Sequence, residues 1–307
     1  MDEFLKELTV AIQNRSDHEL SISSVEVIKN NDVKFTGINI SRNDRKIGKN
    51  FYVDLLYQRY KNGEEVSDMA EEILSEYFRD NGCTEQKILL RINDISDYDS
   101  IKSFVVLSLV NREWNREYLA DKYHVPFLDL AVAFRILMGR GKVGTATTAV
   151  SNDMFKRWDI SEQELYDTAL INTMREFPGI IKSFENLLAE RIIDPVKMPS
   201  INSAEIFGTG MYVLTNEMYM HGATAMLYKK QLRGFCETKG CNGAVIIPSS
   251  VNEVILIPNQ EEICLDPVAI KEMIMDVNKI DVERMEWLSD HPYIYDSESD
   301  EIRDYSD

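Results

Sequence analysis

The 307-residue sequence has little cysteine, no long apolar run and no excess of basic residues. Its four cysteines, Cys83, Cys236, Cys241 and Cys264, are too few for a disulfide framework in a chain of this length. Only Cys236 and Cys241 lie close together, and a structural zinc site needs a second pair of similar spacing. We therefore expect reduced thiols, no metal site and no cofactor.

No segment has the composition of a membrane span or of a secretory signal. The longest apolar stretches, 104–110 and 128–138, are short or interrupted by charge, whereas a membrane-spanning helix needs roughly 20 apolar residues. The N-terminus is acidic and amphipathic, where a secretory signal has a basic head followed by an apolar run. The sequence predicts a cytoplasmic protein with no membrane partner.

Basic side chains do not balance the acidic ones, and the net charge of −18 is concentrated at one end. Residues 1–150 have a net charge of −4 and residues 151–250 of −2, whereas residues 251–307 carry 16 acids and 4 bases. Without a basic field, direct binding to nucleic acid is not expected. The acidic end could instead bind a basic protein, imitate DNA or serve solubility alone.

The alternation of apolar residues predicts an α+β fold with mainly antiparallel sheets flanked by helices. Two β-branched runs, 22–28 and 33–40, are joined by turn-forming residues and predict a hairpin. Further strands are predicted at 104–110, 126–136, 145–150, 211–215, 243–247 and 251–257. Helices are predicted at about 4–12, 65–78, 113–122, 161–173 and 223–237 and from 267, with 51–60 open between strand and helix.

An irregular stretch at 194–205, rich in proline, serine and asparagine, is the best candidate for a boundary. It would separate an N-terminal α+β region, 1–193, from a C-terminal α+β region, 206–289, unless both belong to one integrated domain. From Ser289 onward no apolar period is visible, so residues 290–307 are predicted to be an acidic tail, mostly disordered or draped over the surface.

The segment Gly139-Arg140-Gly141-Lys142-Val143-Gly144 matches the letters of a dinucleotide-binding loop. In such a loop the glycines lie between a strand and a helix, whose N-terminus faces the pyrophosphate. Here the residues that follow are strand-like. Gly139, Gly141 and Gly144 therefore remain candidates for cofactor binding, but a glycine-rich hairpin loop is the favoured interpretation.

Candidate catalytic groups occur in the segment from Met211 to Pro258. Ser249 and Ser250 lie between two apolar strands with Glu253 close behind, so hydroxyl and carboxyl groups could meet at one edge. Activating a serine takes an adjacent base, and His221 could approach only through the fold. Asn216 and His221 themselves could form a pocket rim or cap a helix. The alternative is that the serines bind backbone groups in a tight turn.

The same segment carries a family resemblance, and the block Pro248-Ser249-Ser250-Val251-Asn252-Glu253-Val254 is its most specific part. Together with 127–132, 158–172, 211–216, 221–223 and 288–296, this block resembles the bacterial domain-of-unknown-function family 5688, over roughly residues 50–296. The resemblance implies a cytosolic or mobile-element-encoded bacterial protein and implies no activity.

One position departs from the pattern of similar proteins, which tend to have histidine where this chain has Asn252. If that histidine is a base or a ligand, its function should be missing here. If it is structural, asparagine can replace its hydrogen bonds.

These observations favour a non-enzymatic protein-binding or regulatory factor that engages a basic protein through its acidic C-terminal arm. The alternative is a hydrolase or nucleotide-handling enzyme with a site of Ser249, Ser250, Glu253, Asn216 and His221. A second alternative is an acidic inhibitor that imitates DNA. The sequence leaves the partner and the oligomeric state open.

Overall fold

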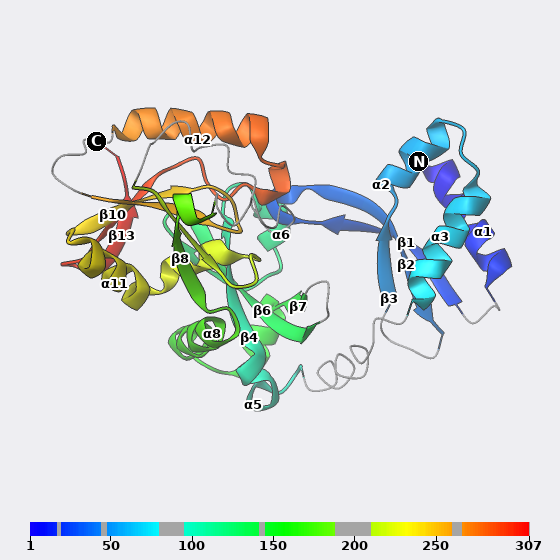
Figure 1. The fold of residues 1–307 in the computed structure, drawn as a ribbon. Helices are drawn as coiled ribbons and strands as arrows, with labels where there is room; N and C mark the ends of the chain where they lie inside the picture. Colours follow the sequence, from blue (N-terminus) through cyan, green and yellow to red (C-terminus); the bar gives the residue numbers. More distant parts are fainter. Residues whose placement is uncertain are drawn as a thin grey trace.

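The computed structural model describes residues 1–16, 20–43, 48–79, 95–140, 145–187, 210–259 and 266–306. Within these ranges the strands form three antiparallel sheets accompanied by helices, so the predicted α+β class is confirmed. No helix among these residues is long and apolar enough to cross a membrane. We refer to residues 1–79 as the N-terminal unit and to residues 95–306 as the body; the two lie at opposite ends of the molecule (Figure 1).

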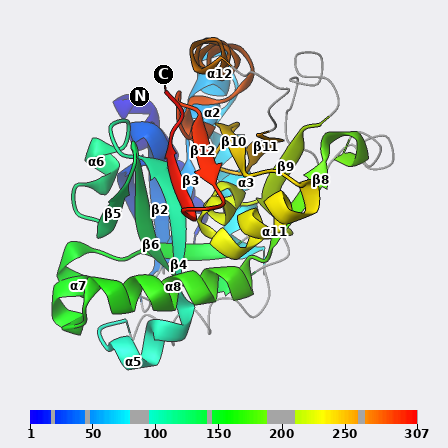
Figure 2. The same ribbon diagram turned by 90° about the vertical axis from the view of Figure 1, so that its left-hand side faces the viewer.

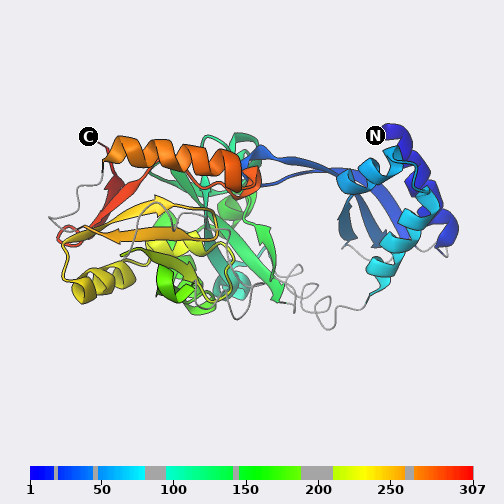
Figure 3. The same ribbon diagram turned by 45° about the horizontal axis from the view of Figure 1, so that its top comes forward.

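The N-terminal unit is a three-stranded sheet, in the order β1-β2-β3, covered by helices. Its elements are α1 (Asp2–Arg15), β1 (Leu20–Ile28), β2 (Lys34–Arg42), β3 (Gly48–Tyr52), α2 (Asp54–Lys61) and α3 (Val66–Phe78). Phe4, Leu8 and Ile12 of α1 are fully buried in its core. The predicted hairpin is confirmed as β1 and β2, which form a long ribbon reaching the body (Figure 3). The ambiguous segment 51–60 begins as a strand and continues as a helix.

The first sheet of the body has the order β4-β6-β5, with β7 also paired to β6. Its strands are β4 (Val105–Asn111), β5 (His124–Phe127), β6 (Leu130–Arg140) and β7 (Thr145–Ala149). The prediction of one strand over 126–136 is wrong, because Leu128 adopts a left-handed conformation with φ of 56°. The chain reverses there, and β5 and β6 pair as a hairpin with Asp129 in its turn.

Helices and short helical turns flank this sheet. They are α5 (Tyr98–Ile101), η2 (Lys102–Phe104), α6 (Arg116–Leu119), α7 (Asn152–Trp158) and α8 (Glu162–Glu176). The helix predicted over 161–173 is confirmed as α8, and the hydroxyl of Ser161 caps it by accepting a hydrogen bond from the backbone of Glu164 at 3.1 Å. The polar helix predicted over 113–122 is reduced to the single turn α6.

The second sheet of the body has six strands in the order β13-β12-β10-β11-β9-β8. They are β8 (Gly179–Ser183), β9 (Tyr212–Asn216), β10 (Gly243–Pro248), β11 (Val254–Pro258), β12 (Tyr293–Asp296) and β13 (Glu301–Asp304). The accompanying helical elements are η4 (Gly222–Leu227), α11 (Lys229–Lys239), α12 (Pro267–Asp281) and η5 (Arg284–Glu286). The helix predicted from 267 is confirmed as α12, which Asp266 caps, whereas the helix predicted over 223–237 is interrupted at Tyr228.

The prediction of a disordered or draped C-terminal tail is wrong. β12 pairs with β10 inside the second sheet, and β13 pairs with β12. Tyr293 and Tyr295 alternate along β12 and are fully buried, so two large side chains hold this segment in the core. This short alternation of tyrosines is difficult to recognise in the sequence because most of the neighbouring residues are acidic or polar. The acidic C-terminal residues 289–306 therefore form a folded arm. Its last strand, β13, lies at the end of the body that faces away from the N-terminal unit (Figure 1), and the two strands of the arm, coloured red, are in front in the view of Figure 2.

One apolar core joins the two sheets of the body. Phe134 from the first sheet and Leu214, Ile246 and Tyr293 from the second belong to the same buried cluster. A separate cluster lies between the second sheet and α12. The boundary predicted at 194–205 lies outside the described residues.

Candidate functional site

The tip of the β1–β2 hairpin inserts its short turn η1, residues 30–32, into the body. Asn31 is 6% exposed there and exchanges hydrogen bonds with Asn115, which lies just before α6. The Asn31 side-chain amide also donates to the carbonyl oxygens of Arg284 and Trp287, at 2.7 and 2.8 Å. Asn31 has a φ of 59°, a left-handed conformation that asparagine tolerates better than most residues. The N-terminal unit is thus bound to the body by side-chain amides.

Charge and aromatic packing reinforce this docking. The carboxylate of Asp32 accepts hydrogen bonds from two backbone N–H groups at the start of α6. The guanidinium of Arg284 lies over the rings of Trp114 and Trp287, at 4.6 and 4.4 Å from their centroids. The loop that contains η5 is therefore fixed on the hairpin side.

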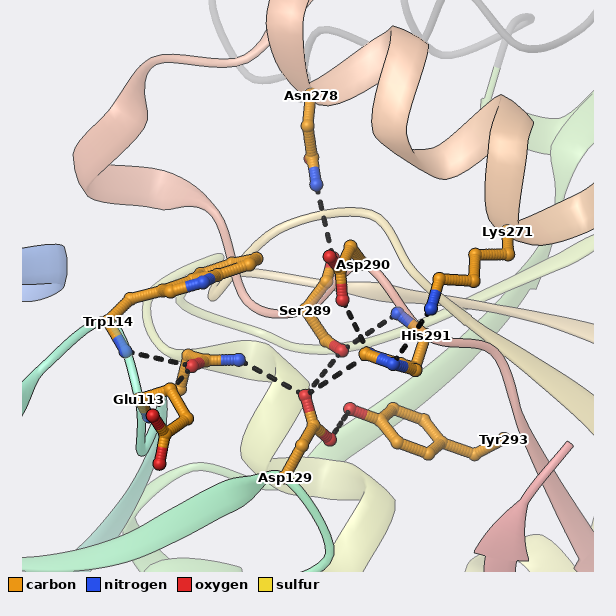
Figure 4. Close-up of polar contacts among 10 residues, drawn as sticks. Glu113, Trp114, Asp129, Lys271, Asn278, Ser289, Asp290, His291 and Tyr293 are labelled. Atoms are coloured by element: carbon orange, nitrogen blue, oxygen red, sulfur yellow. Dashed lines mark hydrogen bonds and ion pairs between the residues drawn. The ribbon is translucent and has the colours of Figure 1, made fainter. Parts of the chain in front are cut away.

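Asp129 is the centre of a polar cluster between the first sheet and the C-terminal arm (Figure 4). Its Oδ1 accepts from the hydroxyl of Tyr293 at 2.6 Å. Its Oδ2 accepts from the hydroxyl of Ser289 at 2.7 Å and from the Asn111 amide at 3.1 Å. Burial and the neighbouring Asp129 carboxylate raise the pKa of Tyr293, so the phenol remains a donor. Asp129 therefore ties the base of the acidic arm to the β5–β6 turn.

Next to Asp129, a chain of polar groups reaches the surface through His291 (Figure 4). Lys271 Nζ lies 3.0 Å from His291 Nε2, and His291 Nδ1 lies 2.5 Å from the carboxylate of Asp290. An ammonium group can only donate, so Nε2 is assigned as the acceptor and Nδ1 as the protonated nitrogen. The nearby Ser289 hydroxyl donates to Asp129 and is fully buried, so it is not accessible to a substrate. This cluster can orient and hold, and it contains no free nucleophile among these groups.

The predicted serine–glutamate group forms the turn between β10 and β11. The hydroxyl of Ser250 donates to Glu253 Oε1 at 2.9 Å, and that of Ser249 points to the same oxygen at 3.4 Å. Ser250 also accepts from the backbone of Asn252 at 3.0 Å. The structure thus brings three candidate residues, Ser249, Ser250 and Glu253, into one contact group.

Glu253 is an unusual carboxyl because it is only 4% exposed. Burial raises its pKa to about 7, with the charge of Glu286 adding to the rise and the two serine hydroxyls opposing it. A carboxyl with a pKa near 7 can accept or release a proton under physiological conditions, which is the property of a general base. It can equally be a hydrogen-bonded brace of the turn.

The remaining candidates are held through their backbones or within their own turn. Asn252 Oδ1 accepts from the backbone of His221 at 3.1 Å, and its amide contacts Glu286 Oε1 at 3.4 Å. The side chain of Asn216 bonds to backbone groups of Met218 and Met220 in the turn that follows β9. His221 therefore approaches the serine–glutamate turn through its main chain, and Asn216 stabilises a loop.

His221 has a buried ring. Its Nδ1 has no hydrogen-bond partner among the described residues, and burial lowers the pKa of the imidazole to about 4. The residue has a φ of 49°, a left-handed conformation uncommon for histidine. The imidazole is therefore neutral near pH 7.

The glycine-rich motif lies at the end of β6. Gly139 pairs with Ala146, and the residues from Thr145 form the strand β7, where a dinucleotide-binding loop would continue into a helix. Gly141 and Gly144 lie outside the described residues, as do Cys83 and Cys264. Within the described part of the chain, no three histidine, cysteine, aspartate or glutamate side chains are grouped as metal ligands.

Sequence reasoning did not single out Asp129, Ser289, His291 or Lys271 as site residues. Two of the segments quoted for the family resemblance, 127–132 and 288–296, contain three of them. Two sequence signals could have identified this group. One is the acid Asp129 within a chain reversal between two apolar strands, and the other is the alternation of tyrosines at Tyr293 and Tyr295.

The comparisons with known proteins extend the resemblance to the start of the chain. The model of a family of unknown function, DUF5688, matches residues 1–297. No curated protein and no solved structure matches the chain.

Proposed function

The chain belongs to DUF5688, a family of unknown function, so its surface is the basis for assigning a role. We propose that it is a non-enzymatic binding protein that captures an extended basic segment of another protein. The binding element is the outer strand of the folded acidic arm. The observation that carries the proposal is the position of β13 at the edge of the six-stranded sheet.

β13 offers backbone groups for pairing. Among the described residues, no strand pairs with its outer side. An exposed edge strand is a template for an added strand, and many peptide-binding proteins use this mode of recognition. Residues of β13 and the turn before it would supply the main-chain hydrogen bonds.

The charges around β13 select a basic partner. Asp296 and Asp300 are paired with Arg303 and Arg233, at 2.9 and 2.8 Å. The acids Glu298, Glu301 and Asp304 are exposed and make no ion pair with a described residue. Lysine or arginine side chains on an added strand would meet these carboxylates, which favours association and selects against acidic segments.

The arm is ordered before any partner arrives. Tyr293 and Ser289 fix its base on Asp129, and Tyr295 is buried. An ordered edge avoids the entropic cost that a disordered acidic tail would bear on binding.

A direct test uses a synthetic ten-residue peptide of alternating lysine and valine, with binding followed by fluorescence anisotropy at low salt. Replacing Glu298, Glu301 and Asp304 together by lysine should weaken binding at least about tenfold, because attraction turns into repulsion. Deleting residues 290–307 is a poorer test, since it would remove β12 from the sheet.

The matched control carries the same change of net charge on three exposed helical acids elsewhere, Glu71→Lys, Glu164→Lys and Glu272→Lys. This variant should bind the peptide nearly as well as the unmodified chain. Equal weakening in both triple variants would mean that only net charge is sensed, and the proposal would be wrong.

A second candidate is hydrolysis at the serine–glutamate turn, favoured by the 2.9 Å contact between the Ser250 hydroxyl and a carboxyl with a pKa of about 7. Glu253 would take the proton of Ser250 as the hydroxyl attacks the ester carbonyl and would pass it to the alcohol that leaves as the ester C–O bond breaks; water would then hydrolyse the acyl group from Ser250. Covalent labelling by a fluorophosphonate, lost in Ser250→Ala and in Glu253→Gln but kept in Ser249→Ala, would establish it. No labelling of the unmodified chain would eliminate this candidate.

A further inference from the structure

The face of the first sheet that lies opposite the main core is mostly apolar, with Val110, Ala131 and Ala133 buried on it, but it also carries two polar side chains that the proposed function does not use. Leu107, Leu109 and Phe134 lie in the main core. Side chains alternate along a strand, so Ser108 and Arg135 project from the opposite face. The register pairs Arg135 with Val106 and Ala133 with Ser108, which makes Ser108 and Arg135 diagonal neighbours on that face.

Two buried polar atoms, one on Ser108 and one on His221, have no hydrogen-bond partner among the described residues. Ser108 is 1% exposed, and its hydroxyl makes no hydrogen bond with any described residue. The Nδ1 atom of His221 is buried and equally without a partner in the described ranges. Buried polar atoms in folded proteins are nearly always hydrogen-bonded to protein or to ordered water, so each of these two atoms has a hydrogen bond left to offer.

His221 is placed beside this face by η4, which it precedes. Thr224 of η4 accepts a hydrogen bond through Oγ1 from the backbone of Leu109, the neighbour of Ser108, at 3.3 Å. The guanidinium of Arg135 is close enough to help burial in lowering the pKa of His221. The position of His221 is fixed, because Gly222 lies so tightly against the carbonyl of Asn252 that a Cβ there would clash at 2.2 Å.

Arg135 is a partly buried cation held by neutral groups only. Its Nε and Nη2 donate to the hydroxyl of Thr147 at 2.9 and 2.6 Å, and its Nη1 donates to the hydroxyl of Tyr118 at 2.9 Å. No carboxylate among the described residues forms an ion pair with it. A guanidinium prefers an oxyanion as its partner, and none is provided by this part of the chain.

We propose that Arg135, Ser108 and His221 form a binding site for a small oxyanionic group, a carboxylate or a phosphate. The guanidinium supplies the charge, and the serine hydroxyl and the imidazole N–H donate to the oxygens. The neutral imidazole adds a donor without a second charge. The site is separate from the acidic arm and would give the protein a small-molecule ligand in addition to the proposed protein partner.

The test is calorimetric titration of the full-length chain at pH 7 with inorganic phosphate and, separately, with acetate, at an ionic strength matched with sodium chloride. Saturable binding of one probe assigns the site to that class of anion. Removing one hydrogen bond to a charged ligand weakens binding about tenfold or more, so Ser108→Ala should show this loss. Arg135→Gln should abolish detectable binding.

Two further measurements keep the test independent of folding. Ser108→Ala deletes a hydroxyl that has no partner in the free protein, so its Tm without anion should be unchanged or higher. In His221→Asn the new residue also tolerates the left-handed conformation, and this variant should bind the anion about tenfold more weakly. Tyr98→Phe deletes a buried hydroxyl in the main core and serves as the matched control, with unchanged binding.

Absence of saturable binding for both probes would overturn the proposal. So would equal affinities of the unmodified chain, Ser108→Ala and Arg135→Gln for whichever probe binds.

Discussion

Two carboxyl groups lie on either side of the loop that contains η5, and they are held in different ways. Asp129 uses both oxygens and accepts hydrogen bonds from Tyr293, Ser289 and Asn111. Glu253 receives two hydroxyl groups on Oε1, one of them at 3.4 Å, and its pKa is raised to about 7. Asp129 is thus a fixed structural contact with three donors, whereas at Glu253 burial raises the pKa and the two hydroxyl donors oppose that rise only in part.

The loop between them connects both carboxyls with the N-terminal unit. Val251 donates its backbone N–H to the carbonyl of Glu286 at 2.8 Å, on the Glu253 side. Asn31 of the hairpin tip binds the carbonyl of Trp287 at 2.8 Å. Ser289, at the end of the loop, reaches Asp129. Changes at the two carboxyls should therefore differ in size and in pH dependence, although both act on the same loop.

The largest effect is expected for Asp129→Ala. Three donors would lose their acceptor, and each unsatisfied buried group costs about 1–3 kcal/mol, so the free energy of unfolding should fall by at least about 3 kcal/mol. Denaturant unfolding measures it. The exposed acid Asp121 gives the control, since Asp121→Ala should cost about 0.5 kcal/mol or less. If both variants lose the same small amount, Asp129 is not a fixed structural contact.

Glu253→Gln comes next, and its effect depends on pH. The folded pKa of Glu253 is raised, so the stability that its neutral form contributes is complete below pH 4.5 and is lost as pH rises through about 7. The loss amounts to ~3 kcal/mol, which glutamine would avoid. Glu253→Gln should therefore be more stable than the unmodified chain at pH 8 and no more stable at pH 5. A difference between the two chains that is the same at pH 5 and pH 8 would contradict the raised pKa.

Ser250→Ala should have a smaller effect than either carboxyl substitution. It removes the stronger donor to Glu253 and the acceptor for the backbone of Asn252, so a loss of about 1–2 kcal/mol is expected. It should also raise the pKa of Glu253 further, because that hydrogen bond favours the ionised form. Ser249→Ala, with its 3.4 Å contact, is the control and should cost less. The opposite order of the two losses would invalidate the assignment of Ser250 as the main donor.

The smallest effect is expected for Asn252→His, which restores the residue that similar proteins tend to have. Histidine can accept the backbone N–H of His221 and donate toward Glu286, so stability should change by less than about 1 kcal/mol. Asn252→Ala should lose more, because the N–H of His221 is left without its acceptor. Thermal unfolding of both variants compares them; a larger loss with histidine than with alanine would show that the position is not a simple hydrogen-bonding one.

The parts of the fold that were predicted correctly are those set by neighbouring residues. Ser161 and Asp266 cap their helices through contacts two or three residues away, and the β1–β2 hairpin is specified by its own turn. The errors have long-range causes. Ser289 reaches Asp129 across 160 positions, and the packing that orders β12 is provided by a sheet formed elsewhere in the chain. Local composition around Tyr293 contains no sign of that sheet.

The candidate site divides in the same way. Ser249, Ser250 and Glu253 were predicted to lie together because they share one turn. His221 contacts this turn through its backbone. The direction of its side chain is set by a left-handed backbone conformation, which cannot be predicted from a histidine in the sequence. The role of Asp129 depends on three donors, one from β4 and two from the C-terminal arm. No motif or spacing in the sequence connects these donors with Asp129.

Amide hydrogen exchange of β13 (Glu301–Asp304), with and without saturating lysine–valine peptide, tests the proposed function most directly. Pairing with an added strand should slow exchange in β13 by at least about tenfold, while β8, at the other edge of the same sheet, remains unchanged. Unchanged exchange in β13 at saturating peptide would contradict the capture of a basic segment by the acidic arm.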